Sequence, residues 1–280
     1  MMFLDILPKD SLLIKSFHSG EFVYQKGESS SEGICFVLNG KVETDHIDQE
    51  NHIVKLVFNQ FKFFGLSAFV SNIRMDTVKA MEDGTKVLFI SESDFSFCMN
   101  ADSQFIIRAI QYMMNYIQTI NIDTNHDLMR SFKLNTILDQ VDQNRLAKMK
   151  EQNLRIHSQI YHSRFRLVNP GQFVYSEENL VDSDLYLILE GEVVHYVNDP
   201  KDPTKEIPIL RLEPGYIFGF IKKDANKGHV LNVRAGSNGA LTIHLDSDLL
   251  RQVAKNDEMV AYSIFQTLCL LMAMIENLCI

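Results

Sequence analysis

The chain has 280 residues, of which 46% are hydrophobic, and its net charge is −9 at pH 7. This length suffices for two compact domains, each with its own core. The acidic balance and the lack of a Lys/Arg-rich block exclude the positive surface that nucleic acids or anionic lipids require, so we expect no direct nucleic-acid binding. The four cysteines form no Cys-x-x-Cys pair and have no zinc-like spacing, which predicts reduced thiols and no metal site. Residues 1–7 are too short an apolar run for a secretory signal, which favours a cytoplasmic protein.

Short strands are predicted between residues 16 and 91. Segments 22–24, 34–38, 53–57 and 87–90 are rich in β-branched and aromatic residues and are separated by turn residues, a pattern typical of a small antiparallel barrel. Helical periodicity follows. The apolar face of this predicted helix, the first seam, is formed by Ile106, Ile110, Met113, Ile117 and Ile120.

A polar stretch with an intermittent apolar stripe, residues 123–158, is interpreted as a helical connector. A second set of strand patterns follows, and then a last helix. The apolar positions of this helix, the second seam, are Ala261, Ile264, Leu268, Leu271, Ile275 and Leu278. We therefore expect two domains, residues 1–122 and residues 159–280, each a β-barrel followed by a long helix.

The two predicted barrels are copies of one another. GEFVY at residues 20–24 recurs as GQFVY at 171–175, and Phe64-Gly65 recurs as Phe218-Gly219. Because the copies lie more than half the chain apart, they indicate a tandem pair of domains and not a solenoid of short repeats.

Each seam could pack against its own barrel or meet a partner. For the first helix the sequence leaves both alternatives open. The last helix is apolar on most sides, because Phe265, Leu270 and Met272 lie off its seam, and such a helix needs burial on most sides. We expect it to meet its own copy in a homodimer. Glu276 and Asn277 interrupt the apolar run and disfavour a membrane span.

Four short motifs recur in both copies with small changes: Gly-Glu, Leu-x-Gly, Phe-Gly and Thr-Val-x-Ala. Their combination resembles the cyclic nucleotide-binding domain, as in catabolite activator protein and kinase regulatory subunits. The resemblance implies a mainly β fold with helices, built from two tandem jelly-roll barrels. It also implies a site in which backbone N–H groups and an Arg hold a cyclic phosphate.

The phosphate cassette of that family reads Phe-Gly-Glu-x-Ala and then Arg-x-Ala-Thr-Val, and residues 64–78 match it in part. The resemblance implies these candidate ligand-binding residues: Gly65, Leu66, Ser67, Ala68, Arg74 and Thr77. Leu66 replaces the Glu that accepts the ribose 2′-hydroxyl, and Asp76 replaces a small residue beside the phosphate. Arg74 then has two interpretations: it forms an ion pair with Asp76, or it keeps an anion site.

The second cassette departs further from the family. Phe220 takes the Glu position and His229 the Arg position, where a neutral imidazole is a poor substitute for a guanidinium. Weaker candidates for ligand binding there are Gly219, Lys222 and His229.

No enzyme motif competes with this resemblance, because the sequence contains no glycine-rich phosphate loop, no Gly-x-Ser-x-Gly and no His-Glu-x-x-His. The expected function is a non-enzymatic regulatory or scaffolding protein that acts through protein association, with cAMP and cGMP binding lost. The alternative is a sensor of a cyclic nucleotide or another small anion, which would bind in the first domain through Arg74 and the helix N-terminus at Gly65–Ala68. Only this alternative involves a cofactor-like ligand, cAMP or cGMP.

Overall fold

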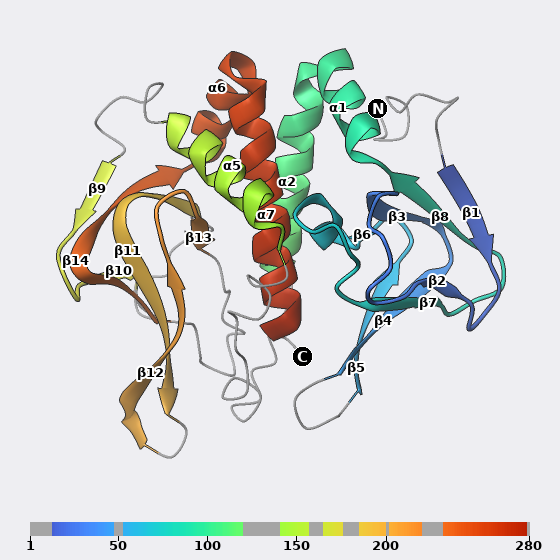
Figure 1. Ribbon diagram of the computed structural model, residues 1–280, viewed down its shortest axis with the longest axis horizontal. Coiled ribbons are helices and arrows are strands. Elements are labelled where there is room, and N and C mark those ends of the chain that lie inside the picture. Colours follow the sequence, from blue (N-terminus) through green and yellow to red (C-terminus); the bar gives the residue numbers. More distant parts are fainter. Residues whose placement is uncertain are drawn as a thin grey trace. The chain divides into compact units, whose positions relative to one another are not determined.

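The computed structural model describes residues 13–47, 53–119, 141–156, 165–175, 185–199, 202–219 and 232–278. The chain divides into two compact units, one that extends to Phe105 and includes Asp139–Asp142, and one that contains Ile106–Leu138 and Gln143–Cys279. Each unit contains one of the two β-barrels that the repeat predicts (Figure 1). The expected boundaries at residues 122 and 158 lie outside the described residues and stay predictions.

The first barrel is built from two four-stranded antiparallel sheets (Figure 1). One sheet has the order β1 (Leu13–Phe17), β8 (Thr85–Ile90), β3 (Ile34–Asn39), β6 (Phe63–Phe64). The other has the order β2 (Phe22–Tyr24), β7 (Thr77–Ala80), β4 (Lys41–Ile47), β5 (Ile53–Asn59). Side chains such as Val37, Val42, Val78 and Val87 are fully buried between the sheets and form the core.

Strand β8 leads into helix α1 (Glu92–Ala101), which begins with a capping box. Ser91 Oγ accepts the N–H of Asp94, and the Asp94 carboxylate accepts the N–H of Ser91, an arrangement that stabilises a helix start by about 1 kcal/mol. The ring of Phe95 meets Phe69 and Phe105 edge-on, with centroids 5.2 and 4.9 Å away. Phe69 ends the short 3₁₀ helix η2 (Leu66–Phe69), so these rings hold the cassette against α1.

The second barrel forms one six-stranded antiparallel sheet. Its strands are β9 (Phe165–Val168), β10 (Phe173–Tyr175), β11 (Leu185–Asp199), β12 (Asp202–Leu212), β13 (Ile217–Gly219) and β14 (Asn232–Leu245). Strands β11 and β14 each cover a segment that forms two strands in the first copy. The pairing between them shifts register near Gly191, which has a φ of +74°, so a bulge bends the long strands where the first copy breaks them.

The second unit contains α5 (Gln143–Leu154), α6 (Ser247–Asn256) and α7 (Glu258–Leu278), together with most of α2 (Ser103–Thr119). Helix α5 lies along α7 (Figure 1). Asn153 of α5 donates to the carbonyl of Gly215 at 2.9 Å and to Thr267 Oγ1 at 2.6 Å, and its own Oδ1 accepts the hydroxyl of Ser263. A Cβ placed on Gly215 would lie 2.6 Å from the Cβ of Lys150, so this glycine permits the close approach of α5.

Both seams are buried within the single chain. The seam residues with described side chains are at most 8% exposed: Ile106, Ile110, Met113, Ala261, Ile264, Leu268 and Leu271. The side chains of Ile117, Ile275 and Leu278 lie outside the described residues. Contacts inside the chain thus account for the apolar faces of α7 and of α2 (Ser103–Thr119), and a homodimer through them stays a prediction. No helix in the described part of the chain is long and apolar enough to cross a membrane.

Candidate anion site of the first barrel

The cassette of the first barrel turns at Gly65. Strand β6 ends at Phe64, and Gly65 then caps η2 in the left-handed conformation, with a φ of +63°. A Cβ at Gly65 would lie 2.8 Å from Tyr24 Oη and 3.0 Å from Arg74 Nη1. Both the backbone conformation and the lack of space therefore require glycine, and its absence of a side chain lets Arg74 reach the start of η2.

Arg74 is the largest fully buried side chain of the described residues, with 1% of its surface exposed. Its Cζ lies 4.3 Å from the centroid of the Tyr24 ring, which gives a cation–π contact. Its backbone is fixed, because its N–H donates to the carbonyl of Glu28 and its carbonyl accepts the N–H of Gly27. Nε and Nη1 are buried and have no hydrogen-bond partner among the described residues. The guanidinium therefore offers two unused donors inside the barrel.

Asp76 does not neutralise Arg74 by a direct ion pair. Both carboxylate oxygens of Asp76 accept from Tyr24 Oη, at 3.1 and 3.3 Å, and no ion pair joins Asp76 to Arg74 among the described residues. Of the two interpretations of Arg74, the ion pair is therefore wrong: Tyr24 contacts both groups, through its ring for Arg74 and through its hydroxyl for Asp76. Burial raises the pKa of Asp76, and the Tyr24 hydrogen bond and the Arg74 charge oppose this rise.

The remaining candidates of the first cassette differ in what they offer. Leu66 is 1% exposed and apolar, so no acceptor stands at the position that the family uses for a ribose hydroxyl. The carbonyl of Ser67 already accepts the N–H groups of Val70 and Ser71, whereas Ala68 is buried and contributes no side-chain polar group. Thr77 Oγ1 accepts the N–H of Lys26 at 3.0 Å.

Sequence reasoning missed Tyr24 as a site residue. In the sequence, the only signal for Tyr24 is that it ends the repeated GEFVY segment, and this position predicts a core residue of a strand. In the structure it is buried and joins Arg74 to Asp76. Burial, followed by the charge of Asp76, raises the pKa of Tyr24 well above its usual value, so its hydroxyl remains a donor.

Of the three candidate residues of the second barrel, the structure describes only Gly219. Gly219 ends β13 with a φ of +134°, and Lys222 and His229 lie outside the described residues. Elsewhere in this barrel His195 is buried, its Nδ1 has no partner in the part of the chain that the structure describes, and burial lowers the pKa of His195 to about 4. Its equivalent in the first copy, Thr44, has a buried hydroxyl that also lacks a partner in that part.

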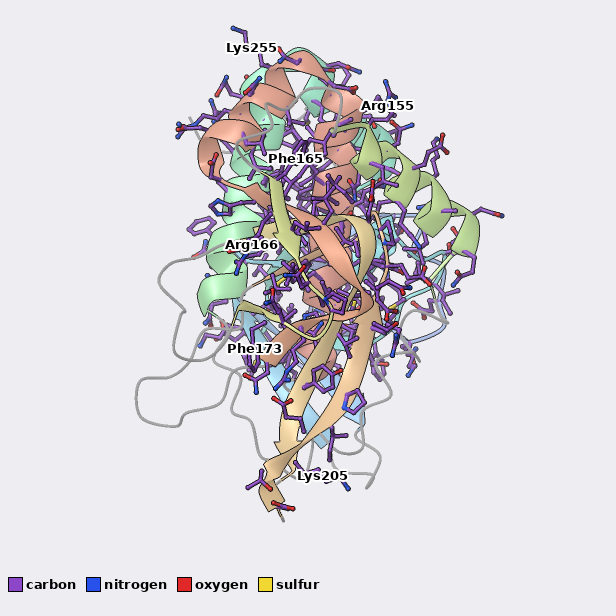
Figure 2. The ribbon with its side chains drawn as sticks, turned by 90° about the vertical axis from the view of Figure 1, so that its left-hand side faces the viewer. Arg155, Phe165, Arg166, Phe173, Lys205 and Lys255 are labelled. Carbon is purple, nitrogen blue, oxygen red and sulfur yellow. The ribbon has the colours of Figure 1, made fainter. Side chains whose placement is uncertain are left out.

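The two barrels also share a cation stacked on an aromatic ring. In the second barrel Arg234 Cζ lies 4.1 Å from the ring centroid of Phe173, which is on β10 (Figure 2). In the first barrel Lys79 Nζ lies 5.1 Å from the ring centroid of Phe22. Arg234 Nη2 also pairs with Glu206 at 2.7 Å, whereas its Nε is buried without a partner among the described residues.

Comparison with known proteins agrees with this architecture. Residues 14–102 match the family model of the cyclic nucleotide-binding domain. The first barrel belongs to that family. No curated protein sequence matches the chain.

Several solved structures are similar to the chain. The regulatory domain of Toxoplasma gondii PKA with cAMP is 16% identical, with 88% of this chain and 85% of that chain covered and a TM-score of 0.30. A regulatory subunit of a cAMP-independent protein kinase A from Trypanosoma cruzi, bound to guanosine, is 14% identical, with 93% and 81% covered and a TM-score of 0.29. A transcriptional regulator from Thermotoga maritima is 19% identical, with 41% and 89% covered and a TM-score of 0.35. At such identities no ligand or partner is carried over from these proteins.

Proposed function

We propose that the chain is a non-enzymatic regulatory protein whose first cyclic nucleotide-binding domain binds a small anion at Arg74. The observation that carries this proposal is the pair of buried, unpartnered nitrogens, Nε and Nη1. A buried charged donor without an acceptor costs more than the 1–3 kcal/mol of a neutral group, and an anion would remove that cost. The anion-sensor alternative of the sequence therefore has more support than a barrel that has lost all ligand chemistry.

Strong binding of cAMP or cGMP is not part of the proposal. With Leu66 in place of an acceptor, a buried ribose hydroxyl would have no hydrogen-bond partner. The loss costs about 1–3 kcal/mol, which weakens binding by up to about a hundredfold. The carboxylate of Asp76 adds a second negative charge near the phosphate. Both differences weaken a cyclic nucleotide while Arg74 still favours an anion.

The regulatory role requires a protein partner, because a binding module without catalytic groups acts through what it contacts. We include in the proposal a cytoplasmic protein that associates with other proteins. The homodimer is its least supported part, since contacts within the chain already bury both seams. Size-exclusion chromatography with light scattering tests it: a mass near 32.2 kDa would be that of a monomer.

Thermal unfolding with and without 5′-AMP, cAMP or inorganic phosphate tests the anion site. A ligand at 100 times its Kd stabilises the folded state by about 2.7 kcal/mol, which is a measurable rise in Tm. Arg74→Ala should abolish the rise. Arg166→Ala is the matched control, because Arg166 lies exposed on β9 of the other unit (Figure 2). An undiminished rise in Arg74→Ala would refute the proposal.

A further inference from the structure

The outer face of the sheet β2-β7-β4-β5 carries a row of side chains that crosses all four strands (Figure 1). Backbone pairing gives the order of this cross-strand row: Phe22, Lys79, Glu43 and Val57. The sequence neighbours Val42 and Val78 are fully buried in the core. Because successive side chains of a strand point to opposite faces, the row faces away from the barrel interior.

The two ends of the cross-strand row are exposed and apolar, and its centre is charged. Phe22 is 43% exposed and Val57 is 47% exposed. Met81 lies two residues after Lys79, and therefore on the same face, and it is 40% exposed. Exposed apolar side chains that gather on one face are typical of protein–protein interfaces. This face thus combines an apolar contact surface with one cation and one carboxylate on neighbouring strands.

The order of the cross-strand row is complementary to itself. When two copies of the sheet stack face to face, a twofold axis along the strands reverses the order of the row in the second copy. Lys79 of each copy then meets Glu43 of the other, and Phe22 of each meets Val57 of the other. A twofold axis across the strands would instead place Lys79 against Lys79, which is repulsive. The order apolar, positive, negative, apolar therefore favours one orientation.

The second barrel lacks this complementarity. Its equivalent row has the order Phe173, Arg234, Val194 and Arg211. The same rotation would place Arg234 against Val194 and Phe173 against Arg211, so no opposite charges would meet. Each arginine already pairs with a carboxylate of its own sheet, Glu206 or Glu192. The repeat thus keeps the aromatic residue and the adjacent cation in both barrels, but only the first barrel has the matching carboxylate.

We infer that the chain forms a homodimer through this face of the first barrel, with the twofold axis along the strands. The occupant of the face is a second copy of the chain, because the charge order of the row matches its own reverse. Glu43 pairs with Lys55 at 2.8 Å within one chain, and Lys79 of the other copy adds a second cation to this carboxylate.

This interface is small. At a strand spacing of about 4.8 Å, the row extends only about 14 Å from Phe22 to Val57, so we expect a dimer that dissociates on dilution. It uses neither helical seam and does not involve Arg74. The inference therefore goes beyond the proposed function and can fail without affecting the anion site.

Sedimentation equilibrium of the full chain over a range of concentrations tests the inference. The wild type should show a reversible equilibrium between the 32.2 kDa monomer and a dimer. Lys79→Glu and Glu43→Lys each place two pairs of like charges in the interface, so each alone should raise the dissociation constant at least about tenfold. An equimolar mixture of the two variants should dimerise again, because each supplies the charge that the other lacks. Pairing of Lys79 with Glu43 inside one chain cannot produce this recovery.

Substitutions on the two barrels provide matched controls. Phe22→Ser should weaken the dimer, whereas Phe173→Ser, at the equivalent and similarly exposed position of the second barrel, should leave it unchanged. Lys148→Glu, an exposed cation on α5, controls for the change in net charge and should also leave it unchanged. Far-UV circular dichroism establishes that each variant is folded.

Three results would overturn the inference. The first is a wild-type chain that stays monomeric throughout the concentration range. The second is a mixture of the two folded charge variants that fails to recover the dimer. The third is a dimer that both charge reversals leave unchanged, since it would form through another surface, such as the helical seams.

Discussion

The hydroxyl of Tyr24 holds the buried charges of the first barrel apart, and Tyr24→Phe tests this role. The substitution keeps the ring under Arg74 but removes the donor that both oxygens of Asp76 use. A buried carboxylate that loses its hydrogen bond costs about 1–3 kcal/mol or more, because the group is charged. We therefore expect the free energy of unfolding to fall by at least that amount at pH 7.

The loss should depend on pH in a defined direction. Burial raises the folded pKa of Asp76 above its value in the unfolded chain, so this group lowers stability progressively as pH rises through that range. Tyr24→Phe removes an interaction that favours the charged form and raises the folded pKa further. The destabilisation should thus be large at pH 7 and small at about pH 3, where Asp76 is largely protonated in the unfolded chain and, with its raised pKa, in the folded chain as well.

Urea unfolding followed by far-UV circular dichroism measures this difference, since the chain has no Trp for fluorescence. Tyr216→Phe is the matched control: Tyr216 is also buried, but its hydroxyl has no hydrogen bond within the described residues. It should cost little at either pH. A Tyr24→Phe chain as stable as the wild type at pH 7, or equally destabilised at both pH values, would refute the reasoning.

Three further predictions concern the second unit. Gly215→Ala should lower the free energy of unfolding by about 1–3 kcal/mol, because its Cβ would meet Lys150 and its φ is +88°; Gly171→Ala, with φ +71° and open space around it, should cost less in the same urea titration. Asn153→Ala should cost about 1–3 kcal/mol by leaving its buried partners unpaired, and equal stability to wild type would contradict the network. The lowered pKa of His195, about 4 against 6.5, means that stability is lost as pH falls from 6.5 toward 4, by up to about 1.4 kcal/mol per unit. His195→Leu should remove this dependence between pH 7 and 5, and an unchanged slope would count against it.

The glycines and the alternating strands made the two barrels predictable. Gly65 and Phe64 are adjacent in sequence and specify the turn of the cassette directly, and Arg74 is buried in the same barrel. Its role in ligand binding stays a prediction. Which group meets Arg74 was not predictable, because Asp76 is its neighbour in sequence whereas Tyr24 comes from β2. The two-residue spacing of Arg74 and Asp76 suggested an ion pair between them. In the structure, Tyr24 from β2 contacts both side chains instead.

The seams illustrate the same limit for the helices. The periodicity of Ile106, Ile110 and Met113 predicted a buried helical face, and these side chains are buried. Periodicity predicts that a helix face is buried, but it does not predict which surface covers that face, because this depends on tertiary packing. The sequence therefore led to the expectation that a second copy of the chain covers it. In α5 the sequence showed an apolar stripe but gave no sign that Asn153 would be its most connected residue.

A crystal structure of the full chain grown with 5′-AMP tests the central claim most directly. We predict a phosphate oxygen about 2.7–2.9 Å from Nε or from Nη1 of Arg74, the range of charge-assisted hydrogen bonds. An Arg74 that donates both groups to Asp76, with no phosphate in the barrel, would contradict the account.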